Sequence, residues 1–113
     1  MRKTANLKPN THFGGQTFQK IMVYENAEGV WVFLYDTTDA LFCAEDLFYE
    51  DMDNAMEEWE DKIDMEGWHE ISDPMPDCQH DCILPVRVKG RDKGAPEWGH
   101  YEILKNGIWE EMS

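Results

Sequence analysis

Hydrophobic and polar positions along the chain predict strands first and a helix second. Residues 18–24 are rich in β-branched and aromatic side chains, residues 26–29 offer a turn, and residues 30–35 form a continuous apolar run. A run of this length is too short for an ordinary helix and is typical of a buried strand. The pattern therefore predicts an antiparallel hairpin whose second strand is central, followed by a short strand at residues 41–43.

Residues 52–63 carry the one helical pattern. Apolar side chains recur there every three or four residues, at Met52, Ala55, Met56, Trp59 and Ile63. This spacing places them on one side of an amphipathic helix whose other positions are mostly acidic. Asp51 or Asp53 can cap its first turn, and Gly67 is the expected stop. Acids near the C-terminus of this helix oppose its dipole, which indicates that helix stability alone did not select them.

The remaining patterns are short and extended. Residues 68–72 and 85–89 are predicted strands, and the proline-containing residues 73–77 begin the loop between them. Asn106-Gly107 suits a two-residue type I′ turn, which would set Leu104 opposite Trp109 in a hairpin. The predicted fold class is α+β, with a hairpin-rich antiparallel sheet of about five to seven strands packed against one principal amphipathic helix.

Length and composition bound the organisation. A chain of 113 residues fits one domain. Residues 1–16 contain Pro9 and Gly14-Gly15 and few large apolar side chains, so we expect a flexible N-terminal tail there and a single α+β domain over residues 17–113.

The compartment follows from what the sequence lacks. No stretch approaches the roughly 20 apolar residues of a membrane span, and no apolar region follows the basic N-terminus as in a secretory signal. Three cysteines, an odd number, argue against a disulfide framework. We therefore expect a cytoplasmic protein.

Charge is the most informative feature. The formal net charge is −14, and residues 36–77 hold sixteen acidic residues against one basic residue, Lys62. The resulting negative potential repels nucleic acid and anionic membranes and attracts a basic protein. The leading hypothesis is a non-catalytic protein-interaction module, and the bland alternative is a helix face kept acidic for solubility alone.

The residues expected to bind the partner are acidic positions of the helix together with nearby aromatic anchors: Glu57, Glu58, Glu60, Asp61, Phe48, Tyr49 and Trp68. In size, acidity and α+β layout the chain resembles small bacterial immunity proteins, many of which neutralise basic nuclease domains, and acidic mimics of nucleic acid. The resemblance is one of type and carries no motif. It implies a partner that is inhibited by binding.

A metal-binding protein is the alternative from another class. On an extended segment Cys78, His80 and Cys82 would point the same way and could bind zinc, with a fourth ligand from elsewhere. The spacing departs from that of usual zinc sites. The competing interpretations are that both cysteines fill the core or form a disulfide with each other, so no cofactor is the primary expectation.

Enzymatic chemistry has no distinct signature. Four His and three Cys make pairings easy to invent, and no phosphate-binding loop is present. The basic cluster Arg87, Lys89, Arg91 and Lys93 is expected to neutralise the protein's own acidic surface or to pair with a second copy. The chain is therefore expected to be a monomer or a homodimer.

Overall fold

The computed structural model describes residues 1–112 and confirms the α+β class. Its strands are β1 (Arg2–Asn6), β2 (His12–Phe13), β3 (Gln16–Thr17), β4 (Lys20–Asn26), β5 (Gly29–Tyr35), β6 (Glu45–Tyr49), β7 (His69–Ile71), β8 (Val86–Val88), β9 (Tyr101–Lys105) and β10 (Ile108–Glu111). The helical elements are α1 (Met52–Trp59) and the 3₁₀ turns η1 (Glu60–Lys62) and η2 (Arg91–Lys93). The described chain forms two compact units, Met1–Asp73 and Pro74 onward.

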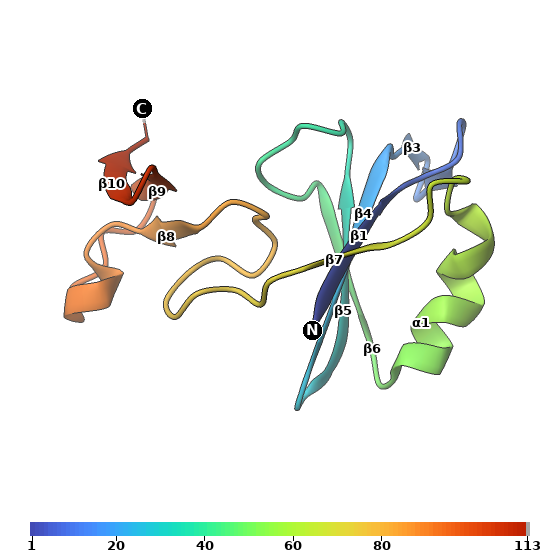
Figure 1. Cartoon of the computed structure of the whole chain (residues 1–113), viewed down its shortest axis with the longest axis horizontal. Helices are drawn as coiled ribbons and strands as arrows, with labels where there is room; N and C mark the ends of the chain where they lie inside the picture. The colour runs from blue at the N-terminus through green and yellow to red at the C-terminus, as the bar shows by residue number, and fades with distance from the viewer. Residues whose placement is uncertain (113) are drawn as a thin grey trace. The chain divides into compact units, whose positions relative to one another are not determined.

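The first unit is built on a five-stranded antiparallel sheet. Its strand order is β6-β5-β4-β1-β7, and α1 lies against one face of it (Figure 1). The predicted hairpin is confirmed as β4 and β5, which pair from Lys20 opposite Tyr35 to Asn26 opposite Gly29. As predicted for an apolar run, β5 is central, because β4 and β6 flank it on either side.

The hydrophobic core lies between α1 and this sheet. Its buried members are Ala5, Leu7, Phe18, Ile21, Val23, Val30, Val32, Leu34, Ala55, Trp59 and Ile63. Residues from β4 and β5 enter at alternate positions, as expected where one face of a strand is covered. The helix buries Ala55 and Trp59 fully, and Met52 and Met56 pack against the core with partial exposure.

Helix α1 begins as predicted but ends earlier. The Asp51 carboxylate accepts a 2.8 Å hydrogen bond from the backbone N–H of Asn54 and so caps the first turn. The chain leaves the helix at Trp59, tightens into η1, and forms a bridge between Ile63 and Leu7. Pairing with the chain that follows β1 therefore ends the helix before Gly67, which lies in a later turn with φ 76°.

The structure differs from the prediction of a flexible tail over residues 1–16. Residues 2–6 form β1, which pairs with β4 on one side and β7 on the other, and residues 12–17 form the β2–β3 hairpin. The sequence did not predict β1 because its residues are mostly polar. Arg2 is buried because its Nε donates a 2.7 Å hydrogen bond to the Ser72 carbonyl, so a charged side chain is accommodated within the sheet.

The single domain over residues 17–113 stays a prediction; within the described residues the chain divides into two compact units after Asp73. The second unit has its own antiparallel sheet, β10-β9-β8, and its hairpin turns at Asn106 and Gly107 with φ 52° and 78°. Leu104 pairs with Trp109, as the turn predicted. Prolines and aspartates between residues 73 and 77 interrupt regular structure and separate the two sheets.

The third predicted strand is displaced. Residues 41–43 lie in the connection after β5, and the strand that pairs with β5 begins at Glu45. The Ala44 N–H donates to the Leu34 carbonyl at 2.8 Å, so hydrogen bonding to β5 starts directly after the apolar triplet and the paired register starts at Glu45. Within residues 1–112, no helix combines the length and apolar character needed to cross a membrane.

Candidate functional site

The acidic segment, residues 45–61, spans β6, α1 and the start of η1. Its carboxylates are Glu45, Asp46, Glu50, Asp51, Asp53, Glu57, Glu58, Glu60 and Asp61, and it contains no Lys or Arg. Eight of these nine residues are exposed, including the helix cap Asp51, and only Glu45 is half-buried. Among the residues that the structure describes, one ion pair involves this segment, at 3.5 Å between Asp61 and the neighbouring Lys62. Among the described residues, no Lys or Arg side chain forms an ion pair with a carboxylate between Glu45 and Glu58.

The C-terminal end of the segment is different. Lys8 Nζ donates a 2.7 Å hydrogen bond to the Asp61 carbonyl, and Lys62 Nζ donates to the Glu58 carbonyl. Both ammonium groups lie near the negative end of the helix dipole, which favours them there. Glu60 accepts a 2.8 Å hydrogen bond from the Trp68 indole N–H. Of the four predicted acids, Glu60 lies beside a donor and Asp61 beside cations. The carboxylates of Glu57 and Glu58 form no ion pair with a described Lys or Arg, although the Glu58 carbonyl accepts from Lys62.

The three predicted aromatic anchors do not form one cluster. Phe48 is 47% exposed and lies beside Trp31, with ring centroids 4.8 Å apart. Tyr49 is the next residue of the strand, so it points to the opposite face, and it packs against the core below α1. Trp68 is half-buried, and Lys3 Nζ lies 4.4 Å from its ring centroid. Phe48 is the one exposed aromatic side chain among these.

Tyr49 joins the acidic segment to the core. Its hydroxyl accepts a 2.9 Å hydrogen bond from the Trp59 indole N–H. Burial raises the pKa of Tyr49 above its ordinary value of 10.0; the Trp59 hydrogen bond acts in the opposite direction, and Glu58 raises the pKa further through a hydrogen bond and through its charge. Tyr49 is therefore a neutral hydrogen-bond donor at physiological pH, suited to hold Glu58 in place.

The predicted metal ligands are placed differently from one another. Cys78 and Cys82 are buried and His80 is exposed, in a segment of turns with Asp77 at φ 65° instead of a continuous strand. The alternation that would aim three ligands one way is therefore absent from this segment. Across residues 1–112, no three His, Cys, Asp or Glu side chains are arranged to hold a metal ion. All three cysteines are in the thiol form.

The basic cluster finds partners within its own unit. Arg87 lies 3.1 Å from Glu102 and 3.6 Å from Asp92, and its guanidinium stacks 3.8 Å from the Trp109 ring centroid. Lys89 lies 3.1 Å from Glu111, whose hydrogen bond and charge raise the pKa of the Lys89 ammonium. Two cations of the cluster are thus neutralised locally, in contrast to the acidic segment.

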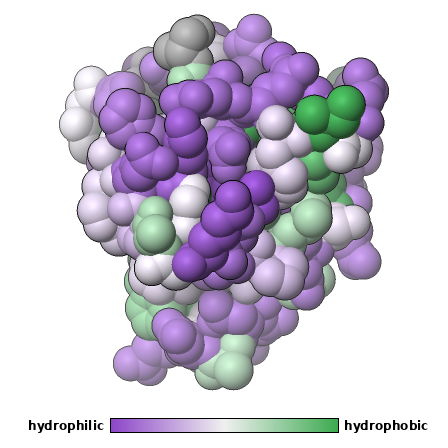
Figure 2. Space-filling model, turned by 90° about the vertical axis from the view of Figure 1, so that its left-hand side faces the viewer, coloured by the Kyte–Doolittle hydropathy of each residue, from purple (hydrophilic) through white to green (hydrophobic). Residues whose placement is uncertain are grey.

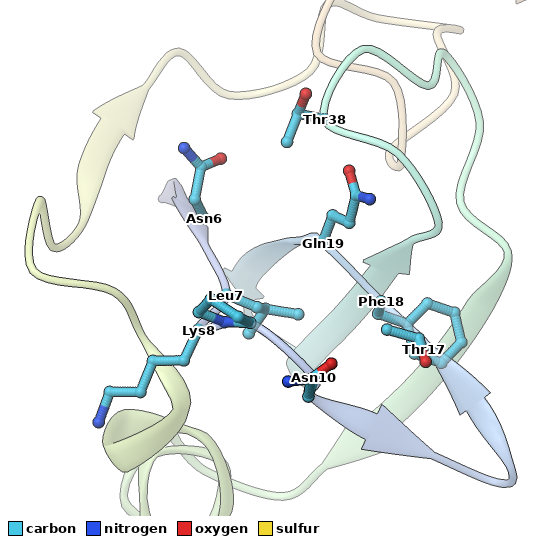
Figure 3. A pocket seen from close by; sticks show the side chains of 9 residues that line it. Asn6, Leu7, Lys8, Asn10, Thr17, Phe18, Gln19 and Thr38 are labelled. Carbon is cyan, nitrogen blue, oxygen red and sulfur yellow. The ribbon is translucent and has the colours of Figure 1, made fainter.

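A cavity of about 410 Å³ lies where β1, the β2–β3 hairpin and the start of β4 meet (Figure 3). It is lined by Asn6, Leu7, Lys8, Pro9, Asn10, Thr17, Phe18, Gln19 and Thr38. Figure 3 shows the Lys8 ammonium directed away from the other labelled side chains, in agreement with its bond to Asp61. Amides and hydroxyls, which both donate and accept, thus surround apolar side chains.

The sequence pattern does not predict this cavity, because its residues come from three separate stretches without a shared motif: 6–10, 17–19 and residue 38. None of the nine lining residues is a Cys, His, Asp or Glu, and Lys8, the one ionisable side chain of the lining, directs its ammonium to the Asp61 carbonyl. Its polar groups could hold a small neutral ligand. The side-chain amides of Asn6, Asn10 and Gln19 are the feature that indicates a polar ligand site, and only the fold brings them together.

The face drawn in Figure 2 is predominantly hydrophilic, and its apolar residues form small separate areas. A partner bound to such a face would meet mainly polar groups, since large apolar patches are the usual mark of a hydrophobic interface.

Comparisons with protein-family models, with curated proteins and with solved structures find no match for this chain.

Proposed function

We propose that this protein is a non-catalytic interaction module that binds a basic protein through its acidic segment and inhibits it, in the manner of an immunity or inhibitor protein. The observation that carries the proposal is the run of exposed carboxylates from Asp46 to Glu58 that no Lys or Arg side chain of the described chain pairs with. A cationic partner would supply the missing counter-charges.

Two features favour binding over a merely solvated surface. Arg87 and Lys89 pair with acids of the second unit, and Lys8 and Lys62 bond backbone carbonyls at the C-terminal end of the acidic segment. The carboxylates from Asp46 to Glu58 are thus left without an ion pair to a described Lys or Arg. Glu57 and Glu58 stand in the last turn of α1, where negative charge opposes the helix dipole and costs stability. Charge retained against stability points to a use outside the fold.

Electrostatic attraction would speed encounter, and an apolar contact would slow dissociation. Phe48 is the exposed aromatic residue nearest in sequence to these acids. Aromatic anchors surrounded by polar groups are typical centres of protein interfaces. The thiol form of Cys43, Cys78 and Cys82 favours the reducing cytoplasm as the compartment where the pair meets.

The test is retention of a basic protein from native lysate, followed by affinity measurement with the purified partner at several salt concentrations. The variant Glu57→Lys/Glu58→Lys should weaken binding and flatten its salt dependence. Glu25→Lys/Glu28→Lys is the matched control, because it makes the same charge change at two exposed acids outside the acidic segment. Equal loss in both variants would mean that net charge alone matters, and no loss in either would refute the proposal.

A further inference from the structure

Strand β6 is an open edge of the five-stranded sheet. It pairs with β5 on one side, from Val30 opposite Tyr49 to Leu34 opposite Glu45, and it stands last in the strand order. On its other side, no backbone hydrogen bond of residues 45–49 to any described residue is found. Since alternate residues of an antiparallel strand direct their N–H and C=O groups to each side, about half of these groups point outward and can pair with another strand.

Side chains on both faces of β6 would flank an added strand. On the face away from α1, Tyr24, Trp31 and Phe48 are consecutive cross-strand neighbours, so an aromatic row ends at the open edge. Phe48 is the member at that edge, and nearly half of its surface is exposed. On the other face, Leu47 and Tyr49 are half-buried against the core. An added strand would therefore find an apolar contact beside its backbone.

The charges at this edge select the occupant. Exposed edges are commonly protected by Lys or Pro, and β6 has neither, carrying Glu45 and Asp46 instead, with Glu50 and Asp51 immediately after it. A second copy of β6 would bring carboxylates against carboxylates, which disfavours a dimer through this edge. A strand that carries Lys or Arg would gain both ladder hydrogen bonds and charge pairing.

We propose that β6 receives an extended basic segment of the partner protein as an additional antiparallel or parallel strand, with Phe48 as its apolar contact. The inference rests on the proposed function for the charge of the partner, and adds to it the place and the mode of binding. Backbone pairing would supply affinity, and alternate side chains would supply specificity.

The probe is a seven-residue peptide in which Lys alternates with Val, with both ends blocked, titrated into the ¹⁵N-labelled full chain. Amide shifts and slowed hydrogen exchange are expected at residues 45–49. The control peptide has Pro in place of each Val, which keeps the charge and removes N–H groups needed for pairing. Phe48→Ala should weaken binding of the Val peptide roughly fivefold or more. Glu70→Lys, at an exposed acid of β7 on the opposite edge of the sheet from β6, should leave binding nearly unchanged.

Equal binding of the two peptides, or shifts confined to regions other than β6, would overturn strand addition. Either result would leave the proposed function standing, because that is judged by the Glu57→Lys/Glu58→Lys variant against a whole basic protein. Slowed exchange at β6 that appears without peptide and grows with protein concentration would identify a second copy as the occupant, and would also overturn the inference. A dispersed amide spectrum of Phe48→Ala ensures that lost binding is not lost folding.

Discussion

The Trp59 indole N–H donates a 2.9 Å hydrogen bond to the Tyr49 hydroxyl, and this bond fastens α1 to β6. Trp59 is 1% exposed, so its N–H has no access to water if the hydroxyl is removed. We expect Tyr49→Phe to lower the free energy of unfolding by about 1–2 kcal/mol, the usual cost of a buried unpaired donor. Urea denaturation followed by circular dichroism measures it.

A double-mutant cycle separates this bond from general packing. Trp59→Phe alone removes the donor and leaves a cavity, so it should cost more than Tyr49→Phe. If the bond stabilises the fold, the loss of unfolding free energy in the double variant should be smaller than the sum of the two single losses by about 1 kcal/mol. Strictly additive losses would show that the bond contributes nothing to stability.

Tyr49 also predicts alkaline behaviour. Burial and the Glu58 charge raise its folded pKa above the unfolded value of 10.0, so above about pH 10 the folded state holds more protons than the unfolded state. The stability contribution is thus complete below pH 10 and is lost as pH rises through the folded pKa. Denaturation between pH 9 and pH 11 should show a steeper fall in the wild type than in Tyr49→Phe, and parallel curves would contradict this assignment.

Gly29 is required where β5 begins. Its φ is 148°, and a Cβ there would stand 2.5 Å from Phe48 Cζ and 2.8 Å from the Tyr49 carbonyl oxygen. We expect Gly29→Ala to cost more than the 1–3 kcal/mol typical of backbone strain. Gly67→Ala is the control, because Gly67 also has positive φ but a Cβ there meets nothing within 4 Å. Similar costs for the two would mean that the close approach of β6 relaxes freely.

Adding Phe48→Ala to Gly29→Ala should recover only part of the loss. The phenyl ring is removed, but the Tyr49 carbonyl belongs to the backbone of β6 and remains in the way. Complete recovery would assign the whole penalty to the ring. Both variants can be compared by thermal unfolding against the single Phe48→Ala variant.

The sequence predicted the hairpin of β4 and β5, the start of α1 and the turn at Asn106, because each follows from local chemistry. Apolar periodicity, a capping carboxylate and an Asn-Gly pair act over a few residues. β1 could not be found in this way. Its sequence is polar, and Arg2 becomes compatible with a buried strand only through the Ser72 carbonyl, seventy residues away.

The candidate site was predictable in charge but not in arrangement. The excess of acids is visible in the sequence, yet whether a cation lies beside each acid depends on the fold. Lys8 reaches the Asp61 carbonyl from residues 1–16, for which the sequence predicts a flexible tail. Strand order likewise cannot be derived from local patterns, so the exposure of Phe48 at an open edge emerged only from the sheet topology.

The second unit offers a test of paired cations. Arg87 bonds Glu102 through Nε and stacks on Trp109, a combination that the ammonium of lysine cannot reproduce. We expect Arg87→Lys to lower the local stability of β8 and β9 by about 1–2 kcal/mol. Faster hydrogen exchange of the β8 and β9 amides would measure this loss. Lys105→Arg, at an exposed pair 3.9 Å from Glu110, should change stability by less than about 0.5 kcal/mol.

Two variants of α1 with the same charge change should have opposite effects on stability. Asp53 lies in the first turn, where a carboxylate is favoured, so Asp53→Lys should destabilise the protein. Glu57 lies in the last turn, which has no basic residue, so Glu57→Lys should stabilise it by about 0.3–1 kcal/mol and can also pair with Asp53 four residues earlier. Both variants remove one exposed acid and add one cation, so differences between them reflect position.

Stability and partner affinity measured on the same pair then decide why the acid is there. If Glu57 serves binding, Glu57→Lys gains stability and loses affinity, whereas an acid that only keeps the helix soluble gains stability at no loss of affinity. A solubility measurement in the absence of partner identifies a third outcome, in which Glu57→Lys aggregates. Its apparent affinity would then fall because less monomer is available to bind. Only the first result is consistent with a surface selected for recognition, because it shows charge retained at a measurable cost to the fold.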